Sequence, residues 1–258
     1  MLCISLVSYL NTKPFLEGLN EEFGSEELSL NLLPPADCAA ALAEEKCDLA
    51  LIPVGSMVDF EELEVLKDYC IGADGPVDSV FMFSQVPLDE IEVLRLDPHS
   101  RSSNGLTRIL FKKRGQKISC LQPTERDFEA ISGTTAGVAI GDAAYAIRGK
   151  YAYVYDLASE WKRLTGLPFV FAVWAARKGA VSEELKARLS RAFARGMGAK
   201  ERCAEKYGQQ YGYTHEEALN YLSHSISFNF DREKHEALRL YFQELINLEP
   251  LMTAFTQD

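Results

Sequence analysis

The sequence predicts an α/β protein of two lobes with a ligand cleft between them. Strands and helices alternate through the first third of the chain, as expected for a sheet covered by helices. Apolar segments near residues 85 and 172 can carry the chain from one lobe to the other and back. We therefore expect residues 1–85 and 173–258 to form lobe 1 and residues 86–172 to form lobe 2.

The first third is predicted to form a β-α-β-α-β unit. Mostly apolar runs predict strands over residues 4–7, 28–33 and 48–53, and helices are expected over residues 14–23 and from an Asp37 cap to near Lys46. Open sheets of this kind bind ligands outside the carboxyl ends of their strands. The segments Ser8–Thr12 and Pro53–Ser56 should therefore lie on the same edge of the sheet.

The junction between the first strand and the first helix is a candidate anion site. Pro14 suits the first turn of a helix, and Asn11 or Thr12 can cap it. The free N–H groups of a helix start attract negative charge. An ordinary strand-to-helix turn would show the same pattern, so both interpretations stay open at this point.

The middle of the chain has two further polar junctions. A strand over residues 92–96 precedes a helix whose start contains three serines, Ser100, Ser102 and Ser103. Capping needs only one hydroxyl, so we expect the others to contact a bound carboxylate. A second strand, over residues 136–140, ends at Gly141, which permits close backbone approach, and at Asp142, which caps a helix over 143–148 or accepts a ligand hydrogen bond.

The last third returns to the first lobe and ends in helices. Residues 167–175 predict a long apolar strand, as a return crossing would need. Helices are then expected to begin at Ser182, at Thr214 with Glu217 in a capping box, and at Asp231.

Charge and composition exclude several classes of function. Residues 1–85 hold 3 Lys/Arg and 16 Asp/Glu, residues 86–172 hold 12 and 10, and residues 173–258 hold 12 and 12, so the charge is unevenly placed along the chain. The net charge of −11 argues against nucleic acid, which needs a basic footprint. No apolar run approaches the roughly 18 residues of a membrane span, and a signal-peptide pattern is absent, so we expect a cytoplasmic protein without a membrane partner.

Metal, disulfide and nucleotide chemistry are not expected. The six cysteines include no C-x-x-C pair, and the four histidines have no metal-ligand spacing. The chain also lacks the G-x-S-x-G, G-x-x-x-x-G-K and G-x-G-x-x-G motifs. We therefore predict no metal and no cofactor, and a hydroxyl-rich cleft suited to a small carboxylate.

Five short motifs, in order, resemble the chorismate dehydratases of menaquinone biosynthesis. They are Val7-Ser8-Tyr9-Leu10-Asn11-Thr12-Lys13-Pro14, Ile71-Gly72-Ala73-Asp74-Gly75-Pro76-Val77, Ser100-Arg101-Ser102-Ser103, Ile140-Gly141-Asp142, and the stretch from Trp161 to Trp174. The resemblance implies a type II periplasmic-binding-protein fold. It also implies conversion of chorismate to 3-[(1-carboxyvinyl)oxy]benzoate and water, the first step of the futalosine route.

On this resemblance, Asn11 is the expected catalytic residue. The expected substrate-binding residues are Ser8, Tyr9, Ser56, Ser79, Ser100, Ser102, Ser103, Gly141 and Asp142. Two alternatives remain: a binding protein that holds a small carboxylate without catalysis, since one fold can serve both roles, and the sister enzyme 1,4-dihydroxy-6-naphthoate synthase.

Overall fold

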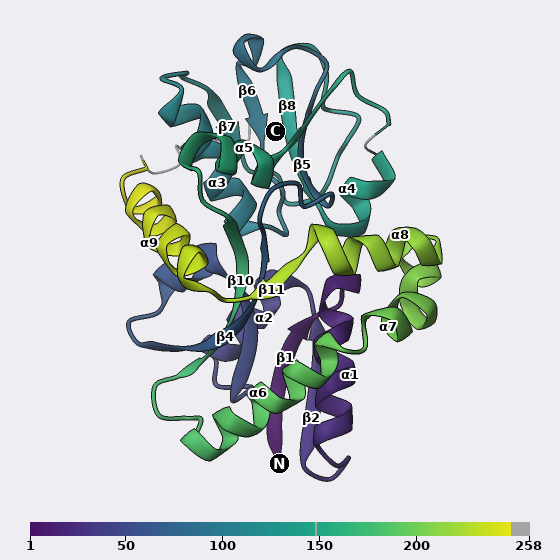
Figure 1. The fold of residues 1–258 in the computed structure, drawn as a ribbon. Coiled ribbons are helices and arrows are strands. Elements are labelled where there is room, and N and C mark those ends of the chain that lie inside the picture. The colour runs from purple at the N-terminus through teal and green to yellow at the C-terminus, as the bar shows by residue number, and fades with distance from the viewer. Residues whose placement is uncertain (148, 249–258) are drawn as a thin grey trace.

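The computed structural model describes residues 1–147 and 149–248, and the side chain of Asp142 is outside this description. Two sheets form the cores of two lobes, one above the other in Figure 1. The first sheet has the strand order β11-β4-β10-β3-β1-β2 and contains β1 (Leu2–Val7), β2 (Leu28–Leu33), β3 (Leu49–Pro53), β4 (Leu63–Ala73), β10 (Phe169–Arg177) and β11 (Ser227–Asn229). The second sheet has the order β7-β6-β8-β5-β9 and contains β5 (Val80–Ser84), β6 (Val93–Arg95), β7 (Ser119–Leu121), β8 (Thr135–Ile140) and β9 (Tyr153–Asp156).

Helices cover both sheets. Those described are α1 (Lys13–Glu22), α2 (Pro35–Ala43), α3 (Arg101–Lys113), α4 (Gly141–Ile147), α5 (Leu157–Thr165), α6 (Glu183–Met197), α7 (Lys200–Tyr207), α8 (His215–Asn220) and α9 (Arg232–Ile246). In Figure 1, α1 and α6 lie beside the first sheet, whereas α3, α4 and α5 lie beside the second sheet. The C-terminal α9 contacts both β10 and α3, so it joins the two lobes. Within the described residues, no helix is both long and apolar enough to cross a membrane.

The predicted β-α-β-α-β unit is confirmed as β1-α1-β2-α2-β3. Strand β1 pairs in parallel with both β2 and β3, so their carboxyl ends meet at one edge. The predicted cap of α2 was wrong, because the helix begins at Pro35 and Asp37 lies within its first turn. Proline is favoured there since its fixed φ suits a first turn and its missing N–H needs no partner.

The chain passes between the sheets after β4 and again after β9. Strand β5 was expected to leave the first lobe, but it pairs with β8 and β9 in the second sheet. By sheet membership the two passages lie at residues 74–79 and 157–168, slightly before the predicted positions near 85 and 172. The assignment of whole residue ranges to each lobe stays a prediction.

Capping at α1 differs from the expectation. Thr12 occupies the N-cap position, but its hydroxyl donates to the carbonyls of Val7 and Tyr9 and makes no capping bond. The Asn11 side chain also leaves the helix and reaches Tyr221. Later caps were predicted correctly: Ser182 and Asp231 accept from their helices, and Thr214 forms its capping box with Glu217.

Helices α1 and α6 approach until their backbones touch. A Cβ atom on Gly18 would overlap the Ala192 carbonyl, and one on Gly196 would overlap the Pro14 carbonyl. Glycine at these two positions therefore sets the distance between the helices. Beside this contact, Phe15 and Phe193 pack edge to face, with ring centroids 5.0 Å apart, in the buried core.

Candidate functional site

A pocket lies where segments of both lobes end. Its volume is about 600 Å³, including the open mouth. The stretch after β1, the end of β3, the turn before β5, the start of α3, the end of β8 and part of β10 line it. None of the described lining residues carries a charged side chain. An anion in this pocket would therefore be held by hydroxyls, amides and backbone N–H groups.

Most of the predicted site residues are brought together here. The pocket is lined by Tyr9, Asn11, Ser79, Ser100, Ser102, Ser103 and Gly141. Two other predicted residues are not among its lining: Ser8 is exposed, and Ser56 is fully buried with an unpaired hydroxyl. Asp142 lies in the first turn of α4, and its side chain is outside the described residues.

Asn11 and Ser79 share one hydrogen-bond partner, the hydroxyl of Tyr221. The Asn11 Nδ2 donates to Tyr221 Oη at 3.0 Å, and Ser79 Oγ lies 2.9 Å from the same oxygen. Tyr221 is only 5% exposed and belongs to a π-helical turn, η5 (Tyr221–Ser225). The network thus connects residues separated by 210 and 142 positions in sequence.

The turn that carries Ser79 is fixed from two sides. The Asp156 carboxylate accepts from the N–H groups of Val77 and Asp78, both at 2.9 Å. Burial raises the pKa of Asp156, although these N–H groups counteract the rise. Asp78 has a left-handed φ of 58°, and its carboxylate accepts from Ser225 at 2.7 Å. Such a backbone conformation is costly for a residue other than glycine, and these contacts hold it.

The start of α3 presents Ser100 and Ser103 to the pocket. Ser100 is the N-cap: its Oγ accepts from the Ser103 N–H at 3.3 Å and donates to Ser103 Oγ at 2.8 Å. The Ser103 hydroxyl therefore accepts one bond and retains a hydrogen that it can donate to a ligand. Together with the helix-start N–H groups, this arrangement favours a bound carboxylate.

Ser102 connects the two lobes. Its hydroxyl accepts from the Gly55 N–H at 3.1 Å and donates to the Phe171 carbonyl at 2.9 Å. Both partners belong to the first-sheet side, in η2 (Val54–Asp59) and β10. The hydroxyl hydrogen of Ser102 is thus already donated within the protein, so direct substrate contact by this group would require breaking a bond.

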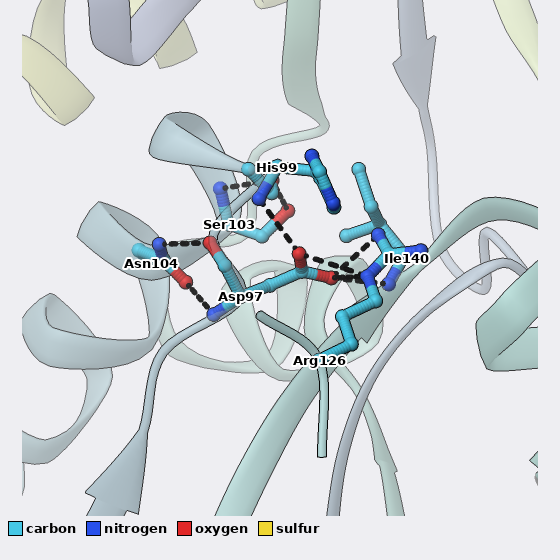
Figure 2. A network of polar contacts seen from close by, with 7 residues as sticks. Asp97, His99, Ser103, Asn104, Arg126 and Ile140 are labelled. Carbon is cyan, nitrogen blue, oxygen red and sulfur yellow. Dashed lines mark hydrogen bonds and ion pairs between the residues drawn. The ribbon is translucent and has the colours of Figure 1, made fainter. Parts of the chain in front are cut away.

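One buried carboxylate organises the second-lobe wall of the pocket. In Figure 2, Asp97 lies between the start of α3 and the end of β8. It forms an ion pair with Arg126 at 2.8 Å and accepts from the N–H groups of His99 at 2.8 Å and Ile140 at 3.2 Å. Asn104 completes this network by bonding both backbone groups of Asp97.

Gly141 and Tyr9 bring the lobes into close contact at the pocket. Gly141 has φ of +64°, and a Cβ atom there would lie 3.3 Å from the Tyr9 ring. Its N–H also donates to the Ser79 carbonyl at 2.7 Å. Glycine is thus favoured here both by backbone conformation and by space.

Sequence reasoning missed four residues that organise the site: Tyr221, Asp97, Arg126 and Asp156. Tyr221 carried no local signal, since its partners lie far away in sequence. Asp97 offered a weak signal, because an aspartate in a turn often accepts from the backbone N–H two residues later, as it does here from His99.

A family model described as menaquinone biosynthesis matches residues 2–246 of this chain. Among curated proteins, the chain is similar to a chorismate dehydratase from Thermus thermophilus, with 27% identity over 162 residues. That alignment covers 56% of this chain and 59% of the relative, which is less than two thirds of the relative's length.

Solved structures are similar over nearly the whole chain at low identity. The protein AF1704 from Archaeoglobus fulgidus has a TM-score of 0.76 at 14% identity, over 95% of this chain and 97% of that one. The aliphatic sulphonate binding protein SsuA from Escherichia coli has a TM-score of 0.63 at 17% identity, over 95% and 90%. The CA3427 gene product of Candida albicans, described as having the generic periplasmic binding protein fold, has a TM-score of 0.61 at 11% identity, over 96% and 94%. The predicted two-lobe, periplasmic-binding-protein-like α/β fold is confirmed.

Proposed function

Because this chain belongs to the menaquinone biosynthesis family, we propose that it is a chorismate dehydratase. The substrate would be chorismate, and the products would be 3-[(1-carboxyvinyl)oxy]benzoate and water. The observation that carries the proposal is the pocket itself, in which an amide and several hydroxyls from both lobes surround a space without charged lining side chains.

The reaction makes modest demands on the protein. Loss of the ring hydroxyl and a neighbouring ring proton breaks one C–O and one C–H bond and forms a ring double bond. The proton and the hydroxide leave together as water, and the six-membered ring becomes aromatic. Because aromatisation supplies the driving force, the protein mainly has to orient the substrate, exclude water and stabilise the leaving group.

The pocket residues suit these tasks. The start of α3, with the Ser103 hydroxyl and free N–H groups, would hold one substrate carboxylate. One N–H of Asn11 is donated to Tyr221, which leaves the second available for the leaving hydroxyl. We propose the side-chain carboxylate of the substrate as the base, in a pocket whose described lining has no charged side chain.

Incubation of the purified protein with chorismate tests the proposal. We expect an aromatic product that is lighter than chorismate by one water molecule, detected by ultraviolet absorbance and mass spectrometry. The Asn11→Asp variant serves as the matched control, since it loses the amide donor and is expected to remain folded.

A second candidate function is capture of a small carboxylate without turnover. It is favoured by the similarity of the fold to binding proteins such as the sulphonate binding protein from Escherichia coli. Tight chorismate binding in calorimetry without any product would support this alternative and contradict the dehydratase proposal.

A further inference from the structure

The Tyr221 hydroxyl is hydrogen-bonded to the proposed catalytic amide of Asn11. Asn11 Nδ2 and Ser79 Oγ both lie within 3.0 Å of it, and both of these residues line the pocket. Tyr221 itself is not among the described lining residues. Its hydroxyl therefore contacts two of the groups that would face the substrate.

Hydrogen-bond chemistry gives this contact a direction. A tyrosine hydroxyl has one hydrogen and can also accept. When it accepts from Asn11, it can donate its own hydrogen to Ser79. The Ser79 hydroxyl in turn donates to the Val77 carbonyl at 3.4 Å. Hydrogen bonds arranged in such a chain polarise and strengthen one another. Rotation of the Asn11 amide would break the first bond of the chain.

Tyr221 is itself held firmly in place. Its ring stacks on the Tyr213 ring, with centroids 5.5 Å apart and an interplanar angle of 18°. Four residues later in the same turn, Ser225 donates to Asp78, next to Ser79. The η5 turn is thus bonded twice to the segment that carries Ser79.

We propose that Tyr221 is a positioning residue, which fixes the Asn11 amide and the Ser79 hydroxyl in the geometry needed for dehydration. This inference rests on the proposed function. Tyr221 acts through Asn11, so its removal should slow the chemical step more than it weakens substrate binding.

The test is the Tyr221→Phe variant, which keeps the ring and its stacking on Tyr213 and is therefore expected to fold. We expect kcat for chorismate to fall roughly 10- to 100-fold, as for a misplaced catalytic group, while KM changes little. The matched control is Tyr151→Phe. This variant also loses a partly buried tyrosine hydrogen bond, to the Phe128 carbonyl at 2.6 Å, but neither residue lines the pocket. The control should retain kcat, and an equal loss in both variants would overturn the proposal.

A double-mutant cycle with Asn11→Ala separates positioning from a general structural effect. If Tyr221 acts through Asn11, the double variant should be about as slow as Asn11→Ala alone, because effects of residues that work as a unit are not additive. Multiplication of the two losses would show that Tyr221 acts independently, contrary to the proposal.

A crystal structure of Tyr221→Phe gives a readout that needs no activity. The Asn11 side chain should adopt a different rotamer, and an unmoved side chain would contradict the positioning role. The wild-type assay with chorismate judges the proposed function separately: without turnover there, that function fails, and the crystal structure alone decides whether Tyr221 positions Asn11.

Discussion

Replacement of Ser102 by alanine should destabilise the protein far more than the same change at Ser103. The Ser102 hydroxyl bonds the Gly55 N–H and the Phe171 carbonyl in the interior, so alanine leaves two buried backbone groups unpaired. Each unpaired buried group costs about 1–3 kcal/mol. The two groups together give an expected loss of about 2–6 kcal/mol, which corresponds to a fall in Tm of roughly 4–24 °C for a chain of this size.

Ser103 provides the matched comparison. Its hydroxyl accepts one bond, from Ser100 Oγ, and pairs no backbone group. Ser103→Ala should therefore cost less than about 1 kcal/mol of stability, and its main effect should be a raised KM for chorismate. Both variants can be followed by calorimetric melting and steady-state kinetics. A Tm of Ser102→Ala close to that of the wild type, or a larger fall for Ser103→Ala, would refute this reasoning.

Three further predictions concern the pocket and its supports. Asn11→Asp should remain folded, because the Tyr221 hydroxyl can donate to the new carboxylate, but it should lower kcat at saturating chorismate on the order of 100- to 1000-fold, the usual effect of losing a donor to developing charge; full turnover would leave Asn11 without a catalytic role. Gly141→Ala should lower the free energy of unfolding by about 1–2 kcal/mol because of the positive φ at this position. It should also raise KM, because the new methyl group would contact the Tyr9 ring in the pocket. Gly115→Ala is the control, with φ of +70° in open space, so it should lose similar stability in urea unfolding without a change in KM. Arg126→Met should lower the free energy of unfolding in urea by about 2–4 kcal/mol. This is less than the loss expected for breaking a fully buried ion pair, because the Arg126 side chain is 21% exposed, whereas that of Asp97 is 0% exposed. Unchanged stability would mean that Asp97 does not depend on this partner.

Local patterns predicted the parts of the fold that depend on local physics. The β1-α1-β2-α2-β3 order followed from apolar periodicity, and the caps at Ser182, Thr214 and Asp231 depend on a few adjacent residues. The short strands β7 and β11 were not predicted, because three residues leave too little periodicity and their pairing partners lie elsewhere in the sequence.

The sequence pointed to candidate residues, most of which line one pocket, but it could not distinguish the contacts that each of them makes. The serines at the start of α3 look equivalent in sequence, yet one caps the helix, one connects the lobes and one offers a hydrogen to the pocket. Asn11 looked like a helix cap because asparagine often is one, and only the folded chain brings Tyr221 within reach of its amide. Long-range partners of this kind have no counterpart in local composition.

The close contact of α1 with α6 has a consequence for how substrate enters. Gly18 and Gly196 place no side chain between α1 and α6, so the two helix backbones are in direct contact. Movement of α1 along α6 would therefore produce backbone clashes. Asn11 lies directly before α1, so it should remain stationary relative to the first sheet. Opening that admits substrate would then move the second lobe, and it would have to break the two bonds by which Ser102 holds the start of α3 to Gly55 and Phe171.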